Sequence, residues 1–133
     1  MTKSRTLHCS VVTPEATIFD GPTVSVVFPA YDGEMGILPN HAPLLTRLGV
    51  GELRITRPEG EVLRYYVEFG FAQVVDNRLT ILTEQALPVA KLDRAAADAA
   101  LAAAQAMPGG TAEATEARDK ALARARVQRK LAP

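Results

Sequence analysis

The residue types that most often carry out catalysis are few in this chain and poorly spaced for it. The two histidines, His8 and His41, form neither of the spacings, HxxxH or HExxH, that bind zinc on a helix. Cys9 directly follows His8, but neighbours on a strand point to opposite faces, so we expect no thiol–imidazole dyad. Ser10 and Ser25 lack the strand–turn–helix setting of an activated nucleophile. We therefore predict no catalytic site, a buried Cys9, and a His41 that hydrogen-bonds within a loop.

Signatures of cofactor and metal binding are also missing from the sequence. Gly49 and Gly51 stand without the remaining residues of any phosphate-binding fingerprint. A single cysteine excludes both an intrachain disulfide and a cysteine metal cluster. We expect no cofactor and no metal.

A basic cluster near the C-terminus is the clearest charged feature. Arg124, Arg126, Arg129 and Lys130 follow one another with no acid among them. No aromatic residue that could stack on a nucleobase is interleaved, and no bulky apolar face lies opposite, as an interfacial membrane helix would need. The formal net charge of zero gives no general basic footprint for nucleic acid. A solvated face is the simplest interpretation, and a protein partner with acidic residues is the next.

Composition divides the 133 residues into two parts. Residues 1–90 hold all seven aromatics and carry a net charge of −3, whereas residues 91–133 hold none and carry +3. Sixteen of the 22 alanines fall in the second part. No apolar run reaches the ~18 residues of a membrane span, and no apolar segment follows the N-terminus as in a secretory signal. We predict two domains, 1–87 and 88–133, with different folds and no direct membrane insertion.

The first part has the pattern of an all-β domain. Short apolar, β-branched runs alternate with turn residues, which predicts a β-sandwich of about ten short strands. Asp76 and Asn77 predict a tight turn, and Gly70, between two strand-like runs, predicts a bend or bulge. The runs most typical of strands are Leu7–Val12, Thr23–Phe28, Gly51–Arg57, Glu61–Phe69, Phe71–Val75 and Leu79–Thr83.

The segment Asp32–Pro43 does not have a strand pattern, because two glycines and two prolines surround its apolar residues. We expect an ordered loop here. Two interpretations of its apolar side chains remain open. Ile37 and Leu38 either close one end of the sandwich core, or they face a binding partner together with Met35.

The second part predicts an antiparallel two-helix hairpin. Residues Leu92–Ala106 have the strongest helix propensity in the chain, and Asp93 is a natural N-cap. Pro108-Gly109-Gly110 ends this helix, and Thr111 caps a second that runs to about Leu131. Few large apolar residues follow position 91, so the hairpin offers little area with which to dock on the sandwich. It is either an element with two stable positions or a permanently docked cover.

Three stretches resemble the epsilon subunit of bacterial-type F1Fo ATP synthase. The similarity runs in order through residues 5–86, and the C-terminal part is similar in architecture. The stretch from Asp32 to Leu44 is highly specific to that family. The matching stretches are Val11-Val12-Thr13-Pro14-Glu15, Asp32-Gly33-Glu34-Met35-Gly36-Ile37-Leu38-Pro39-Asn40-His41-Ala42-Pro43-Leu44 and Leu79-Thr80-Ile81-Leu82-Thr83-Glu84.

The resemblance implies a fold and a function. The fold is an N-terminal β-sandwich with a C-terminal α-hairpin. The function is that of a non-catalytic subunit of the rotary central stalk, peripheral on the cytoplasmic face of the bacterial inner membrane. In the family, the sandwich binds the gamma subunit and the ring of c subunits and couples rotation to proton transport. The hairpin either folds down or extends towards the catalytic α and β subunits, and the extended form inhibits ATP hydrolysis.

The resemblance also implies partner-binding residues. Glu34 and His41 match family positions in a loop near the c-ring and gamma, which favours a partner-facing role for Met35, Ile37 and Leu38. The basic cluster defined above resembles family residues of the second helix that meet acidic groups on β.

A regulatory ATP site is not implied for this chain. Some family members bind ATP through a Leu/Ile-Asp-x-x-Arg-Ala motif, and here Leu92, Asp93 and Ala97 match it. Ala96 stands in place of the arginine, which removes an always-charged phosphate ligand. This substitution leaves Asp93 with the role of a helix cap.

Two alternatives to an inhibitory stalk subunit remain. One is a permanently structural stalk subunit whose hairpin never leaves the sandwich. The other is a free-standing β-sandwich adaptor that uses its basic helix to bind an acidic partner.

Overall fold

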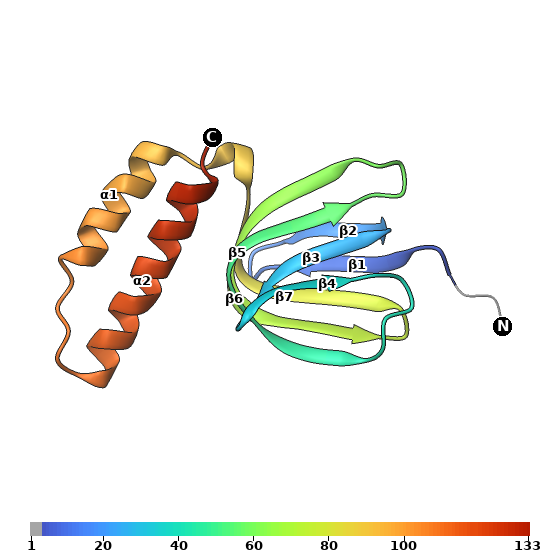
Figure 1. The fold of residues 1–133 in the computed structure, drawn as a ribbon, viewed down its shortest axis with the longest axis horizontal. Helices are drawn as coiled ribbons and strands as arrows, with labels where there is room; N and C mark the ends of the chain where they lie inside the picture. The colour runs from blue at the N-terminus through green and yellow to red at the C-terminus, as the bar shows by residue number, and fades with distance from the viewer. Residues whose placement is uncertain (1–3) are drawn as a thin grey trace. The chain divides into compact units, whose positions relative to one another are not determined.

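The computed structural model describes residues 4–133, which form two compact units, one ending at Pro88 and one beginning at Val89 (Figure 1). The first unit contains only strands and the second only helices. Among the described residues, no helix is long and apolar enough to cross a bilayer.

Seven strands build the first unit as a β-sandwich, in the hydrogen-bonded order β2-β1-β7-β6-β5-β3-β4. All neighbouring pairs are antiparallel except β1 with β7, which is parallel. The strands are β1 (Leu7–Val12), β2 (Thr17–Thr23), β3 (Ser25–Ala30), β4 (Gly33–Ile37), β5 (Leu44–Thr56), β6 (Val62–Val75) and β7 (Arg78–Pro88).

The three long strands, β5, β6 and β7, each contribute to both layers of the sandwich. Along β6, the core-facing residues change from odd positions such as Val67 to even positions such as Ala72 and Val74. The change falls at Phe69 and Gly70, which both have positive φ (55° and 112°). Side chains on a strand alternate between faces, so the core-facing side chains can change from odd to even positions only where the strand bends sharply. Figure 1 shows β5 and β6 curving through such a bend.

The predicted number of strands, about ten, is wrong. The runs Glu61–Phe69 and Phe71–Val75 form the single strand β6, whose pairing with β5 and β7 keeps one register on both sides of Gly70. The predicted bend is therefore present without interrupting the strand. Strand β5 likewise begins at Leu44, well before the predicted Gly51. The turn at Asp76 and Asn77 is confirmed, with φ of 50° and 59°.

The prediction of a loop over Asp32–Pro43 is also wrong in part. Gly33–Ile37 forms β4, an edge strand in which Met35 pairs with Phe28 of β3. The two glycines carry backbone N–H and C=O groups like any other residue, and the two prolines, which lack the N–H, lie outside the strand at Pro39 and Pro43.

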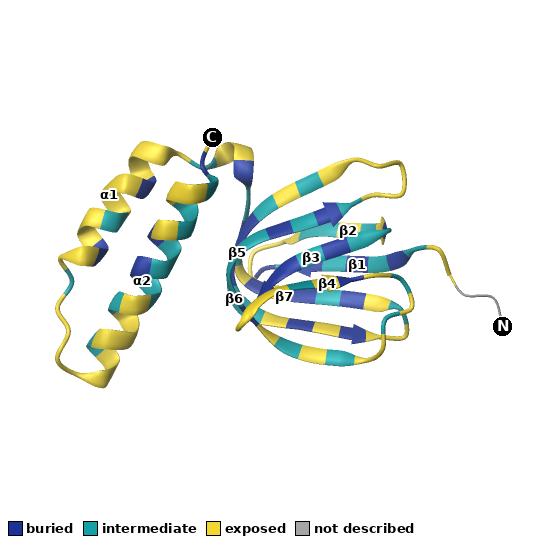
Figure 2. Cartoon of the chain, viewed as in Figure 1, coloured by how far each residue is buried: buried dark blue, intermediate teal, exposed yellow. Residues whose placement is uncertain are grey.

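The core of this unit is apolar and continuous. Buried and exposed residues alternate along the strands, as the blue and yellow bands of Figure 2 show. Leu7, Cys9 and Val11 point inward from β1 and are fully buried. His8 lies on the opposite face of β1 from the buried Cys9, and its ring contacts Asp20.

The second unit is the predicted helical hairpin. A short 3-10 helix (Val89–Lys91) precedes α1 (Arg94–Gln105), and α2 (Ala112–Leu131) follows. The Asp93 carboxylate accepts a hydrogen bond from the Ala95 N–H at 3.0 Å, and the Thr111 hydroxyl oxygen accepts one from the Ala114 N–H at 3.0 Å. Both predicted N-caps are confirmed.

The helices pack against each other mainly through alanine. Their buried residues are Ala97 and Ala104 on α1 and Leu122 and Ala125 on α2. Alanine allows close approach but buries little area, so the contact between the helices is a modest source of stability.

Candidate functional site

One outward face of the sandwich carries most of the exposed large apolar side chains of the described residues. Five of the seven such side chains lie on it, between 42% and 70% exposed. We call this surface, together with one arginine, the open face. Its residues are Tyr31, Leu45, Arg47, Phe71, Val75 and Leu82.

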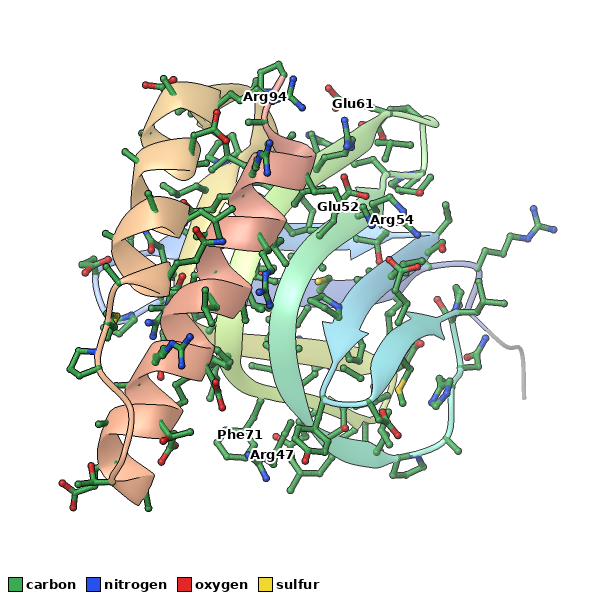
Figure 3. The ribbon with its side chains drawn as sticks, turned by 60° about the vertical axis from the view of Figure 1, so that its left-hand side comes forward. Arg47, Glu52, Arg54, Glu61, Phe71 and Arg94 are labelled. Atoms are coloured by element: carbon green, nitrogen blue, oxygen red, sulfur yellow. The ribbon has the colours of Figure 1, made fainter. Side chains whose placement is uncertain are left out.

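Strand register places these residues side by side. Arg47 of β5 lies opposite Phe71 of β6, and Phe71 lies opposite Leu82 of β7. Leu45, Gln73 and Val75 share the same face, because each is an even number of residues from Arg47 or Phe71 on its own strand. Gln73 lies opposite Leu45 and adds one uncharged polar side chain to the face. The row thus crosses three strands, and Figure 3 shows Arg47 and Phe71 together at one end of the unit.

Tyr31 extends the row from the turn between β3 and β4. Its N–H donates a hydrogen bond to the Arg47 carbonyl at 2.9 Å, and the Arg47 guanidinium carbon lies 4.9 Å from the centre of its ring. A contiguous patch of aromatic, aliphatic and arginine side chains is typical of protein–protein interfaces.

Sequence reasoning missed the open face. The one signal available was the run Phe71–Val75, which places apolar residues on both faces of the strand, whereas a half-buried strand has them on one face only. Only the pairing of β5, β6 and β7 shows that the outward residues of three strands meet.

The five residues that the resemblance assigns to the gamma and c-ring loop lie in different environments. Ile37 is fully buried in the core, so the interpretation of a core plug holds for it and it offers no side chain to a partner. Met35 is partly buried against the same core, whereas Leu38 is 61% exposed. The half-buried ring of His41 donates from Nδ1 to the Ala42 carbonyl at 2.7 Å, as expected of a residue that hydrogen-bonds locally.

Glu34 belongs to an ion-pair network on the outer side of β4, β5 and β6. Its carboxylate lies 3.1 Å from the Arg54 guanidinium, which also contacts Glu52 at 2.8 Å. Glu52 in turn pairs with Arg64. Partial burial opposes ionisation of Glu52, but the hydrogen bonds from both arginines outweigh it and lower its pKa. Glu34 is thus held at the rim of a rigid charged surface.

The basic cluster of α2 is only partly free. Arg126 and Lys130 are exposed, whereas the Arg129 Nε lies 2.7 Å from the Asp98 carboxylate of α1. Arg124 lines a shallow pocket of about 440 Å³ with Lys120 and Glu116. Of the basic cluster, Arg129 therefore already has an acidic partner inside the hairpin.

A second polar cluster lies on the edge of β1 and β2. Asp20 accepts hydrogen bonds from His8 Nε2 at 2.5 Å and from the Ser10 hydroxyl at 3.0 Å, and these bonds lower its pKa. Asp20 stands between the serine and the histidine, so the histidine cannot act as a base towards the hydroxyl. Among the described residues, no group of three or more metal-ligating side chains converges.

Known proteins resemble this chain throughout its length. The family model for the ATP synthase delta/epsilon chain β-sandwich domain matches residues 6–89. The ATP synthase epsilon chain of Rhodopirellula baltica is 43% identical over 122 residues, which are 92% of this chain and 94% of that protein. The epsilon chain of Nitrosococcus oceani is 42% identical over 128 residues, 96% of this chain and 86% of that one.

Solved structures share the fold. A chain of the Euglena gracilis mitochondrial ATP synthase superposes with a TM-score of 0.85 at 22% identity, covering 95% of this chain and 81% of that one. A chain from the central stalk and c-ring of the Tetrahymena thermophila enzyme gives 0.68 at 20% identity, with full coverage of both. The predicted family and fold are confirmed, and the chain belongs to the epsilon-chain family of ATP synthase, whose members are non-catalytic stalk subunits.

Proposed function

We propose that this chain is a rotor subunit that couples rotation of the central stalk to proton transport, and that its hairpin inhibits ATP hydrolysis when it extends. The observation that carries the proposed coupling role is the open face, because a large exposed apolar surface on a folded protein marks an interaction site. We assign this face, together with Glu34, Leu38 and His41, to binding of the gamma subunit and the c-ring. Such a subunit is peripheral on the cytoplasmic face of the bacterial inner membrane.

The proposed inhibition by an extended hairpin is supported by the way the two helices are built. Each helix has its own N-cap, and an alanine interface joins the two. In α2 the first turn holds Glu113 and the last turn holds Arg129 and Lys130, which complements the helix dipole. The helices can therefore separate without losing their own structure. Arg124, Arg126, Arg129 and Lys130 would then meet acidic groups of the β subunit, with α and gamma nearby.

Truncation after residue 90 tests this proposal. The sandwich keeps its complete core, so the shortened chain should still assemble with the stalk. ATP hydrolysis by the purified complex should rise relative to the complex with the full chain. An unchanged hydrolysis rate would remove the inhibitory role and leave the coupling role intact.

The second candidate is a structural stalk subunit whose hairpin stays closed. The ion pair between Asp98 and Arg129 favours it, because it ties α2 to α1. An Arg126→Cys variant separates the two candidates. Cross-linking to the β or gamma subunit under hydrolysis conditions supports extension, and its absence supports the structural role.

A further inference from the structure

Arg47 is the one arginine of the described sandwich whose guanidinium lies over an aromatic ring. Arg54, Arg57 and Arg64 each lie within an ion pair with a glutamate. Within the described part of the chain, Arg47 makes no such pair, and the Tyr31 ring is what its guanidinium contacts. A cation over an aromatic ring uses one flat side of the guanidinium and leaves its N–H donors at the edge available.

The surroundings of Arg47 are apolar. Phe71 lies directly opposite on β6, Leu45 lies two residues away on β5, and Leu82 lies beyond Phe71. The guanidinium lies over the Tyr31 ring on the strand beside Phe71, so a partner that covers both aromatic rings also covers the guanidinium. Arg47 therefore cannot stay hydrated at the rim of the interface.

Covering an arginine without offering it acceptors is strongly unfavourable, because a buried charge needs a paired or hydrogen-bonding group. A carboxylate fits the edge of a guanidinium with two parallel hydrogen bonds. We propose that the open face binds a protein surface that is apolar except for one carboxylate, which pairs with Arg47 while Tyr31 holds the guanidinium in place. This rests on the proposed function only in taking the open face as a docking surface.

The chemistry of the face favours a protein over a lipid or nucleic acid. Anionic membranes and phosphate backbones are bound by several cations together. By strand register the next cation is Arg78, opposite Val75, and its charge acts on Asp20. One arginine among five apolar side chains and Gln73 instead has the composition of an interface hot spot.

Replacing Arg47 with methionine tests the proposal, because affinity should fall if a carboxylate pairs with Arg47 and should not fall if none does. The full chain and its variants are titrated onto ATP synthase from which this subunit has been removed. If a carboxylate meets Arg47, Arg47→Met leaves that carboxylate buried and unpaired, and affinity falls about 10- to 100-fold. If none does, methionine removes an unpaired charge from an apolar face and affinity stays equal or rises, which overturns the proposal. Arg47→Lys should restore part of the affinity, because it keeps the charge without the planar edge.

Two controls separate this inference from the function on which it rests. Arg57→Met removes an arginine paired with Glu59 at a turn away from the open face and should leave affinity unchanged. Phe71→Ser should weaken binding whether or not a carboxylate is present. Loss with Phe71→Ser but not with Arg47→Met overturns the inference and spares the docking face. No loss with either variant overturns both.

The partner carboxylate can then be located. A photo-crosslinking residue at Gln73, beside Leu45 on the same face, should capture a peptide of the complex that contains an aspartate or glutamate. Replacing that acid with alanine should reduce the effect of Arg47→Met to near zero in a double-mutant cycle. If the effects of Arg47→Met and of replacing the partner acid on affinity are additive, the two groups do not interact and the proposed carboxylate is contradicted. Arg47-dependent binding of the chain to phosphatidylglycerol vesicles would also contradict it.

Discussion

The Asp98 carboxylate on α1 and the Arg129 Nε on α2 lie 2.7 Å apart and join the first turns of one helix to the last turns of the other. Arg129 is also one of the residues that we propose to contact the β subunit when the hairpin extends. The same guanidinium cannot do both at once. The ion pair therefore opposes extension, by an amount that is small because both side chains are about half exposed.

Asp98→Ala should shift the hairpin towards separated helices. An exposed pair of this kind contributes up to about 1 kcal/mol, so the separated population should rise about two- to fivefold. Alanine is a better helix former than aspartate, so helix content should not fall. Distances between spin labels at Ala102→Cys and Arg126→Cys measure the population. Asp119→Ala, which removes an exposed acid from α2, is the matched control. An unchanged distance distribution in Asp98→Ala would show that the Asp98–Arg129 ion pair does not hold the helices together.

Gly70→Ala should destabilise the sandwich severely. A Cβ at Gly70 would lie 1.9 Å from the Leu82 carbonyl oxygen, and φ at this residue is +112°. Strain and collision together should cost more than about 3 kcal/mol in the free energy of unfolding. Gly60 has a similar φ of +101° with nothing near its Cβ, so Gly60→Ala should cost only about 1 kcal/mol. Urea unfolding of both variants measures the difference, and equal costs would show that the bend at Gly70 can relax.

Cys9 should be almost unreactive in the folded protein. Burial and, to a lesser degree, the nearby charge of Asp20 raise the pKa of its thiol to about 12. The usual value is 9.0, so the thiolate population near neutral pH is about a thousandfold lower than in the unfolded chain. Alkylation by iodoacetamide should be slow in buffer and fast in guanidinium. Rapid labelling of the native chain would mean that β1 opens locally.

Asp20→Asn should lower stability in a pH-dependent way. Hydrogen bonds from His8 and Ser10 lower the pKa of Asp20 in the folded state below its ordinary 3.8. A carboxylate with a depressed folded pKa stabilises the protein above its unfolded pKa, and this stability is lost as pH falls through the folded value. The variant should therefore have a lower urea midpoint than the native chain at pH 7, and the two should converge only as the pH falls below the folded pKa of Asp20, which lies under 3.8. A difference that persists in acid would show that the carboxylate charge is not the cause.

Local chemistry was enough to predict the helical hairpin and several turns. Asp93 and Thr111 are N-caps because their side chains bond to backbone two or three residues away, which involves no distant part of the chain. Asp76 and Asn77 adopt left-handed conformations that their own short polar side chains tolerate. Such features depend on neighbours in sequence, so their residue types alone identify them.

Tertiary pairing decided the rest. Gly33–Ile37 became a strand because β3 supplied its hydrogen bonds, and Ile37 became a core residue because the long strands fold over it. Arg47, Phe71 and Leu82 are distant in sequence and meet only through the register of β5, β6 and β7. Local sequence specifies which residues can cap or turn, whereas a surface shared by three strands exists only after those strands have paired.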